Sequence, residues 1–413
     1  MSEAGKLIRA NLFYYSLLLI AFTMPLQKLV CSFGILMLFI AWITEGGFSE
    51  KIKRISSSPS LILFLFLYLL YVAGMVYTEN SKEGLFILQK KLPMFFLPLI
   101  IGTSVISQKQ LDMVYKFFVL ACAIAAMICL GYGLYKYFSF NDITYLYFED
   151  LTYIIDFHFV YFSMFLSFCI FILVHFLYSD WKRITASHKL IGFSLIVFFF
   201  SFMLLLTART PLVTMLLILS LIGLYIFLRG GKIIRGAFII SIFIAGLLIS
   251  INQFSFLKER FTKIIESDWS APPNDENANG LTLRIAKWKC SLEGIKENPV
   301  IGKGTGDAQD FLQKCYIKDD FWGYHYSYNS HNQFLQVCLS LGGVGLITFL
   351  LSFSIPFIGF IRKKNNLAIS FILLCLACFL TESILERQNG IVFYSFFLSL
   401  FTFLKEEQES ISK

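Results

Sequence analysis

Apolar runs long enough to cross a bilayer recur along almost the whole chain, and this pattern constrains the fold more than any other feature. A helix needs about 20 predominantly apolar residues to span the hydrocarbon core. Hydrophobic residues make up 57% of the 413 residues, and charged residues make up only 15%. A soluble domain carries about 25% charged residues and cannot bury so much apolar surface. The composition therefore predicts an all-α polytopic membrane protein and excludes a soluble enzyme, a disordered chain and a small disulfide-rich scaffold.

Polar breaks divide the apolar sequence into about twelve predicted transmembrane helices. The predicted spans are 7–23, 29–44, 61–77, 92–106, 114–137, 157–178, 190–207, 211–228, 234–251, 334–361, 367–385 and 391–404. Nine of them precede one long polar loop, and three follow it. We therefore expect three segments: the first nine helices in 1–251, a loop over 252–333, and the last three helices with a short tail in 334–413.

The distribution of Lys and Arg predicts the orientation of these helices. With the N-terminus in the cytoplasm, the short inside loops carry clearly more Lys and Arg than the short outside loops, as the positive-inside rule requires. The even number of spans then brings both termini to the cytoplasm and the 252–333 loop to the outside. The net charge is +8, but its distribution along the chain matters more here than its total. No soluble segment carries a basic stripe with interleaved aromatics, so nucleic-acid binding is not expected.

The 252–333 loop combines two kinds of sequence. Residues 270–277, rich in Pro, Asn and acidic residues, are interpreted as a mobile stretch. Residues 283–298 have the spacing of an amphipathic helix, and Lys287 is expected on its exposed surface. The predicted apolar face of this helix consists of Ile285, Trp288, Leu292 and Ile295.

Two of the nine cysteines, Cys290 and Cys315, lie in this loop. An oxidising compartment would allow them to form a disulfide, and two free thiols are the alternative. The other seven lie in or near predicted spans and are interpreted as small hydrophobic residues.

Two side chains at the outer ends of predicted spans carry candidate chemistry. Arg209 lies in a short turn between two apolar runs, where an Arg is costly unless it is paired or faces water. A phosphate ligand would account for it, because guanidinium binds phosphate oxygens at two points; snorkelling toward lipid phosphates is the alternative. His331 precedes the tenth predicted span and can exchange a proton near neutral pH. A structural role at the helix end is the alternative for His331.

The remaining polar motifs are weaker. Lys28, Lys90 and Lys91 are further cationic candidates. Residues 302–307 resemble a phosphate-binding loop only superficially, because they match neither the P-loop nor the dinucleotide pattern, and are interpreted as a tight turn. No outside cluster of His, Cys or acidic residues has metal-ligand spacing, so neither a metal site nor a cofactor is predicted.

The sequence around His331 follows the spacing of a known signature. His331 and Asn332 are followed by nine residues, then Gly342, two residues and Gly345. This arrangement resembles the signature of the O-antigen ligase family of bacterial inner-membrane proteins. Small residues at this spacing also favour close approach of helices.

Upstream residues extend the resemblance. Arg284, Trp288 and the Pro-x-x-Gly-x-Gly turn of residues 299–304 are similar to the outer-loop pattern of that family. Arg209 matches the family's Arg at the outer end of a span. The resemblance covers about residues 190–400, and the N-terminal third is similar only in hydropathy.

The resemblance implies a glycosyltransferase of GT-C-like architecture in the bacterial inner membrane, with a periplasmic active site. The donor would be a glycan on undecaprenyl diphosphate, and the acceptor a sugar hydroxyl of the lipid A core in lipopolysaccharide biosynthesis. Arg209 and Arg284 would bind the donor diphosphate, and His331 would be the catalytic base. Asn332, Gly342 and Gly345 would support the site. The resemblance also implies inversion at the anomeric carbon, and the arginines could replace a metal ion.

Other functions remain open at this stage. O-antigen or exopolysaccharide polymerases and protein O-oligosaccharyltransferases of the same superfamily differ mainly in the acceptor. A lipid-linked glycan transporter or flippase belongs to a different class. Transporters built from two six-span halves place the long loop inside, between the halves, whereas this chain has its predicted loop outside after the ninth span and shows no internal repeat.

Overall fold

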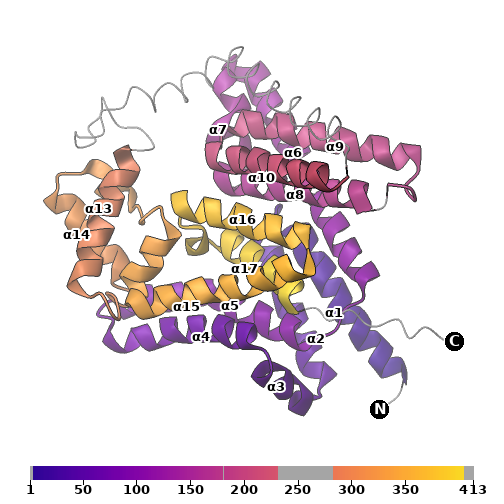
Figure 1. Ribbon diagram of the computed structural model, residues 1–413. Coiled ribbons are helices and arrows are strands. Elements are labelled where there is room, and N and C mark those ends of the chain that lie inside the picture. The colour runs from indigo at the N-terminus through magenta and orange to yellow at the C-terminus, as the bar shows by residue number, and fades with distance from the viewer. Residues whose placement is uncertain (1–2, 180, 231–281, 404–413) are drawn as a thin grey trace.

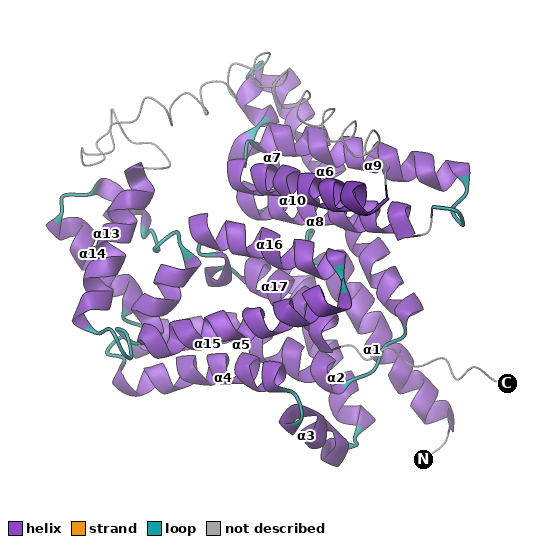
Figure 2. Cartoon of the chain, viewed as in Figure 1, coloured by secondary structure: helices purple, strands orange, loops and turns teal. Residues whose placement is uncertain are grey.

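The computed structural model describes residues 3–179, 181–230 and 282–403, and these residues form helices and connecting turns without a strand (Figure 2). Seven helices in this part are long and apolar enough to cross a membrane. They are α2 (Lys28–Glu45), α4 (Pro59–Gly74) with the 3-10 turn η1 (Met75–Tyr77), α5 (Ser81–Thr103), α6 (Gln108–Phe140), α8 (Phe159–Ser179), α9 (Ala186–Leu206) and α15 (Gln333–Lys363). Shorter apolar stretches lie in α1 (Glu3–Thr23), α10 (Arg209–Gly230), α16 (Asn366–Thr381) and α17 (Gln388–Phe403). The chain is therefore an all-helical, multi-pass membrane protein.

Each predicted span within the described residues overlaps one of these helices, but the span predicted at 92–106 lies mostly in α5, which begins earlier, at Ser81. The predicted span 234–251 and the stretch 270–277 lie outside the described residues. The number twelve, the division into three segments and the compartment of the 252–333 loop therefore stay predictions.

Short helices occupy the connections between the long ones. They are α3 (Phe48–Ser56), η2 (Ile143–Leu146), α7 (Phe148–Thr152), η3 (Tyr153–Ile155), α13 (Thr282–Glu297), α14 (Ala308–Lys318), η4 (Trp322–Tyr326) and η5 (Ile384–Glu386). Helices α13 and α14 lie together at one end of the bundle, orange in Figure 1. The expected amphipathic helix 283–298 is α13.

An aromatic core holds the central helices together. Phe118 of α6 and Phe168 of α8 pack against Phe397 of α17, with ring centroids 4.8 and 4.7 Å away. Phe371 of α16 and Phe393 of α17 join this cluster. Van der Waals packing of this kind drives association of helices in lipid. It also anchors α16, and the site described below begins at the C-terminal end of this helix.

Helix α15 is broken near its start by Gly342, whose φ of 65° is left-handed. The connection after α13 docks into this break, because Gly343 N donates to Pro299 O at 2.8 Å and Lys303 N donates to Leu339 O at 2.8 Å. A Cβ at Gly342 would collide with the backbone of Val300. The expectation that Gly342 allows helices to approach is therefore wrong, since this glycine receives a loop.

Gly345 lies one turn further along α15. A Cβ there would meet Leu341 of the same helix, so this glycine also does not serve an approach between helices. Both glycines belong to the break in α15 and its docked loop.

Residues 302–307 form a connection that joins the α13 region to the helical bundle. Gly302 and Gly304 have left-handed φ angles of 74° and 104°. The carboxylate of Asp307 accepts hydrogen bonds from Glu79 N and Asn80 N, both at 2.8 Å. The glycine-rich stretch therefore serves docking of the loop.

The buried face of α13 differs from the predicted one. Lys287 is only 3% exposed, whereas Leu292, assigned to the apolar face, is 47% exposed. Cys290, Ser291 and Gly294 complete the buried face. The prediction is wrong for Lys287, which lines a polar cavity, and for Leu292, but Ile295 packs as predicted against a buried apolar cluster that includes Leu312 and Leu339.

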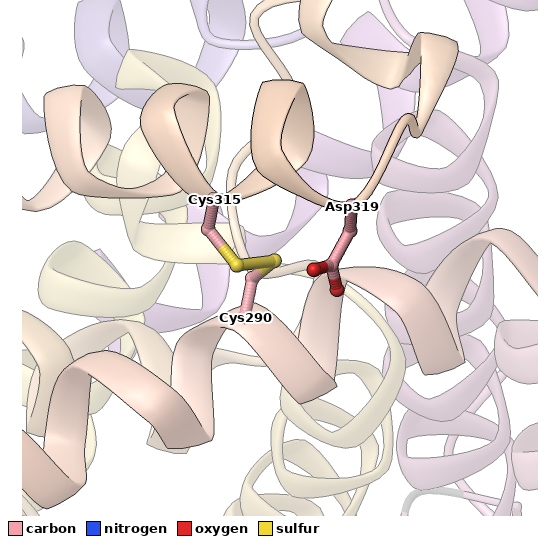
Figure 3. A group of neighbouring side chains, drawn as sticks. All are labelled: Cys290, Cys315 and Asp319. Carbon is pink, nitrogen blue, oxygen red and sulfur yellow. A yellow bond between two sulfur atoms is a disulfide. The ribbon is translucent and has the colours of Figure 1, made fainter.

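A disulfide joins Cys290 of α13 to Cys315 of α14 (Figure 3). Their Cα atoms lie 5.8 Å apart, within the range that disulfides span. Of the two alternatives left by the sequence, the structure has the disulfide.

Candidate functional site

The start of α10 positions Arg209. Helix α9 ends at Leu206 and is capped by Thr207, whose φ of 53° is left-handed, and α10 begins at Arg209. Pro211 suits the first turn of α10, where its missing N–H is not needed. The hydroxyl of Thr381, at the end of α16, donates to Thr210 Oγ1 at 3.1 Å. The first turn of α10 is thereby tied to the end of α16.

The backbone before α15 positions His331 in a constrained turn. His331 itself has a φ of 44°, and such left-handed conformations cost about 1–3 kcal/mol outside glycine. The turn is held because His331 N donates to Asn329 Oδ1 and Ser330 N donates to Gln336 Oε1, both at 3.0 Å. The Oγ atoms of Ser330 and Ser291 lie 2.9 Å apart, which ties the turn to α13.

Asn332 fixes the helix that follows. Its side chain accepts hydrogen bonds from the backbone N–H groups of Phe334 and Leu335 and so caps α15. Its Nδ2 donates to Leu380 O at 3.2 Å. Asn332 therefore supports the position of His331 without facing the same cavity.

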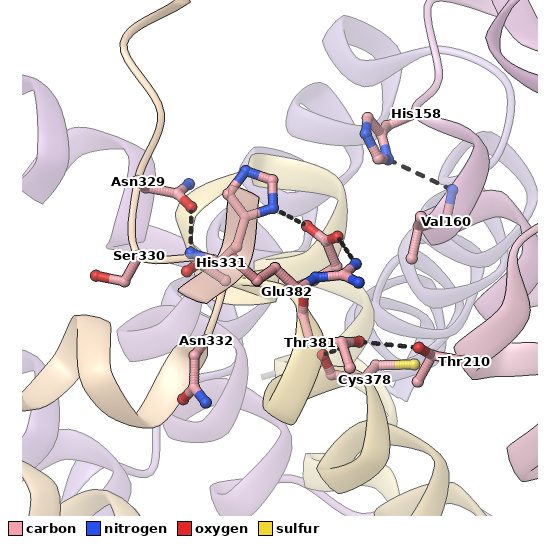
Figure 4. A network of polar contacts seen from close by, with 12 residues as sticks. His158, Val160, Thr210, Asn329, Ser330, His331, Asn332, Cys378, Thr381 and Glu382 are labelled. Carbon is pink, nitrogen blue, oxygen red and sulfur yellow. Dashed lines mark hydrogen bonds and ion pairs between the residues drawn. The ribbon is translucent and has the colours of Figure 1, made fainter. Parts of the chain in front are cut away.

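Glu382 connects the two predicted site residues Arg284 and His331. Figure 4 shows the carboxylate of Glu382 beside the ring of His331. Its Oε2 lies 3.0 Å from His331 Nδ1, and its Oε1 accepts a hydrogen bond of 2.9 Å from Arg284 Nη2. Arg284 Nε also donates to Thr381 O at 3.0 Å. Glu382 follows the C-terminus of α16, where the helix dipole disfavours a carboxylate. Its two partners offset this unfavourable location.

These groups lie outside the membrane-spanning helices, and their surroundings set their charges. Burial lowers the pKa of His331, and although Glu382 raises that pKa, the net shift is downward. Burial alone would raise the pKa of Glu382, but His331 and Arg284 lower it to about 2. The pair at neutral pH is therefore a carboxylate and a neutral imidazole whose Nδ1–H donates to that carboxylate. This tautomer leaves Nε2 of His331 as a proton acceptor.

One cavity of about 250 Å³ brings the predicted residues together. Arg209, Arg284 and His331 all line it, and so does Glu382. They come from the start of α10, from α13 and from the turn before α15. Gly342 and Gly345 do not line this cavity and belong to the break in α15.

Sequence reasoning missed Lys287 as a site residue and gave Glu382 no defined role. Lys287 lines the cavity, and its Nζ lies 3.7 Å from the ring centroid of Tyr328. Burial lowers the pKa of Lys287 to about 7. A signal for Lys287 was available, because it stands three residues after Arg284 and so shares its helix face. No spacing in the sequence points to Glu382.

The weaker cationic candidates lie elsewhere. Lys28 and Lys90 line a second cavity of about 1330 Å³. Lys91 is buried and pairs with Glu386 at 2.7 Å. None of the three lines the cavity of Arg209 and His331.

A possible group of metal ligands also lies apart from this cavity. Among the described residues, atoms of Cys290, Cys315 and Asp319 lie within 4.8 Å of one another (Figure 3). The two sulfur atoms are bonded to each other, so neither is available as a thiolate ligand. This group is therefore a disulfide beside a carboxylate.

The fold and the site together define a class: a multi-pass helical membrane protein with a cationic polar cavity at one end of its bundle. Residues 193–350 match the family model of O-antigen ligases. The matched region runs from α9 into α15 and contains Arg209, Arg284 and His331. The resemblance to the O-antigen ligase family is therefore confirmed for this part of the chain.

The chain is also similar to an uncharacterized protein of Haemophilus influenzae, with 27% identity over 187 residues. The aligned region covers 42% of this chain and 47% of that relative. The chain thus matches about half the length of the relative.

Proposed function

We propose that this protein is an O-antigen ligase, which transfers a glycan from undecaprenyl diphosphate to a sugar hydroxyl of the lipid A core. One observation carries the proposal: Arg209, Arg284 and His331 come from three separate segments and line one cavity. The match of residues 193–350 to the O-antigen ligase family covers all three. Transfer of a glycan from a lipid diphosphate needs cations at the diphosphate and a base at the acceptor, and these residues supply both.

His331 is the proposed general base. Its Nδ1 faces Glu382, so Nε2 takes the proton from the acceptor hydroxyl as the oxygen bonds to the anomeric carbon. Glu382 then stabilises the imidazolium, in the role that a carboxylate plays beside a catalytic histidine.

Arg209 and Arg284 are the proposed ligands of the donor diphosphate. As the bond from the anomeric carbon to the phosphate oxygen breaks, negative charge grows on the leaving undecaprenyl diphosphate. Guanidinium groups stabilise this charge without a metal ion or a cofactor. Direct displacement of this kind inverts the configuration at the anomeric carbon.

The proposed location is the bacterial inner membrane, with the cavity on the periplasmic face and both termini in the cytoplasm. The Lys and Arg bias of the short loops supports this orientation. The disulfide between Cys290 and Cys315 also supports it, because disulfides persist in the oxidising periplasm.

The surface glycolipids of a deletion strain test the proposal. A ligase predicts loss of polymer-capped lipopolysaccharide, with the polymer retained on undecaprenyl diphosphate, and rescue by the intact chain. Caps of a single repeat would instead identify a polymerase, and unglycosylated proteins would identify an oligosaccharyltransferase. A purified protein that moves lipid-linked glycan across vesicles without forming a glycosidic bond would be a transporter.

A further inference from the structure

The second cavity, of about 1330 Å³, lies beside the first. His158 and Glu149 line both cavities, and His158 Nε2 lies 3.6 Å from Glu149 Oε1. These two side chains therefore form a shared wall, and a ligand in the larger cavity can extend toward His331. A cavity of this size accommodates a large ligand, since drug-sized molecules occupy about 300–1,000 Å³.

The walls of this cavity are apolar along two helices. Helix α2 contributes Ile35, Leu36 and Phe39, and α5 contributes Phe86 and Phe96. Leu36 and Phe86 are 51% and 55% exposed. Such walls suit acyl chains that enter from the bilayer.

The rim of the same cavity is charged. Lys28 forms an ion pair with Asp156 at 2.6 Å. Lys90 and Arg387 also line the cavity, and neither has a carboxylate within salt-bridge distance in the described part of the chain. Each instead contacts an aromatic ring, Lys90 that of Phe86 at 4.8 Å and Arg387 that of Tyr161 at 5.9 Å. Three carboxylates also line the cavity, but Asp156 pairs with Lys28, Glu386 pairs with Lys91, and Glu149 lies beside His158. Lys90 and Arg387 therefore remain to favour an anionic ligand.

We propose that this cavity is the acceptor site and binds an anionic glycolipid, with its acyl chains along α2 and α5 and a phosphate on Lys90 and Arg387. The inference rests on the proposed transferase function. The donor's polyprenyl tail explains the cavity less well, because that tail is uncharged and its diphosphate has its own arginines in the smaller cavity. A second set of cations indicates a second anionic lipid.

A kinetic experiment tests the charged rim. The full-length protein in vesicles receives a glycan on undecaprenyl diphosphate and a lipid A-core glycolipid, either phosphorylated or dephosphorylated. In Lys90→Gln/Arg387→Gln, we expect the KM for the phosphorylated acceptor to rise at least about tenfold. The donor KM and the kcat at saturating acceptor should stay within about twofold. Lys82→Gln, on α5 but outside the cavity, is the matched control.

The dephosphorylated acceptor completes the kinetic test. The unchanged protein should bind the dephosphorylated acceptor more weakly than the phosphorylated one. The double variant should bind the two acceptors equally well. A rise in the donor KM alone would assign the cavity to the donor's tail and overturn the proposal. Unchanged KM values for both substrates would overturn it as well.

Cross-linking tests the apolar walls independently of turnover. A photoreactive residue at Leu36 or Phe96 should label the glycolipid, whereas one at Ile40, which is exposed on α2 outside the cavity, should label bulk phospholipid. Labelling of the polyprenyl donor, or of phospholipid only, would contradict the proposal. If no acceptor supports transfer, the proposed function fails, and cross-linking still decides whether the cavity binds the glycolipid.

Discussion

Two carboxylates in one connection, the buried Glu382 and the partly buried Glu386, use their charges in different ways. Glu386 faces Lys91, whose Nζ donates to Glu386 Oε1 and Leu385 O, both at 2.7 Å. The ring of Tyr71 lies 4.6 Å from the same nitrogen. The charge of Lys91 is thus fully used inside the protein. Glu382 instead bonds two groups that both line a cavity.

The comparison distinguishes a structural ion pair, Lys91 with Glu386, from a candidate catalytic pair, His331 with Glu382. His331 is held by Glu382 through Nδ1, and its Nε2 makes no hydrogen bond to any described residue. Arg284 also retains N–H groups beyond those bonded to Glu382 and Thr381. A buried charge indicates function when its partners still have donors or acceptors to offer.

The largest effect should come from Glu382→Gln. The amide can donate to Nδ1 of His331, which reverses the tautomer and removes the acceptor at Nε2. We expect glycan transfer to fall by about 10³- to 10⁴-fold, as for other carboxylates that orient a catalytic histidine. Rates are measured on membranes matched for protein content. Glu386→Gln is the control, measured at saturating acceptor because Glu386 lines the larger cavity. An equal loss of rate in that variant would erase the distinction between the two carboxylates.

A smaller loss is expected from changing the arginines. Arg209→Lys and Arg284→Lys keep the charge but lose the planar two-point contact with phosphate. Each should lower transfer by about 10²-fold, within the range for removal of one stabilising donor. Near-normal transfer by both variants would mean that the arginines act only as diffuse charge, or not at all.

Lys91→Met should affect stability more than rate. Removing one member of a buried ion pair costs about 3–5 kcal/mol, because the other charge loses its partner. We expect earlier thermal unfolding in detergent, while kcat per folded molecule stays within about threefold. A kcat that fell as far as in Glu382→Gln would place Lys91 in the reaction and contradict its structural role.

The smallest effect should be that of pH between 6.5 and 8. The lowered pKa of His331 keeps the imidazole neutral throughout this range. Glu382, with a pKa of about 2, stays charged, so its stabilising contribution is present above its unfolded pKa and is lost only in strong acid. Lys287 lines the same cavity and loses its charge within this range, since its pKa is about 7, so the profile is measured in Lys287→Met. In that variant, transfer should vary by less than about twofold over this range and decline at lower pH as His331 gains a proton. A steep rise in rate between pH 6.5 and 8 would indicate a base with a higher pKa.

Much of this arrangement is predictable from the sequence. Apolar runs locate the spans, and the charge bias favours one common side for Arg209, Arg284 and His331, which do line one cavity. The hydropathy pattern wrongly predicted that Lys287 is exposed. It identifies apolar residues that pack in a core, whereas Lys287 is buried against a polar cavity. The role of Gly342 was also missed, since spacing alone does not show that a loop docks at that point. Glu382 carries no motif and depends on contacts between segments about 50 and 100 residues apart.

The most direct test of the central claim is transfer and donor binding measured together for His331→Ala. Loss of a general base should lower transfer by at least about 10²-fold. Donor binding should remain, because Arg209 and Arg284 are intact and Asn332 still caps α15. Retention of more than about a tenth of the rate would contradict the base role. Loss of donor binding in parallel with the rate would assign His331 to the diphosphate site instead.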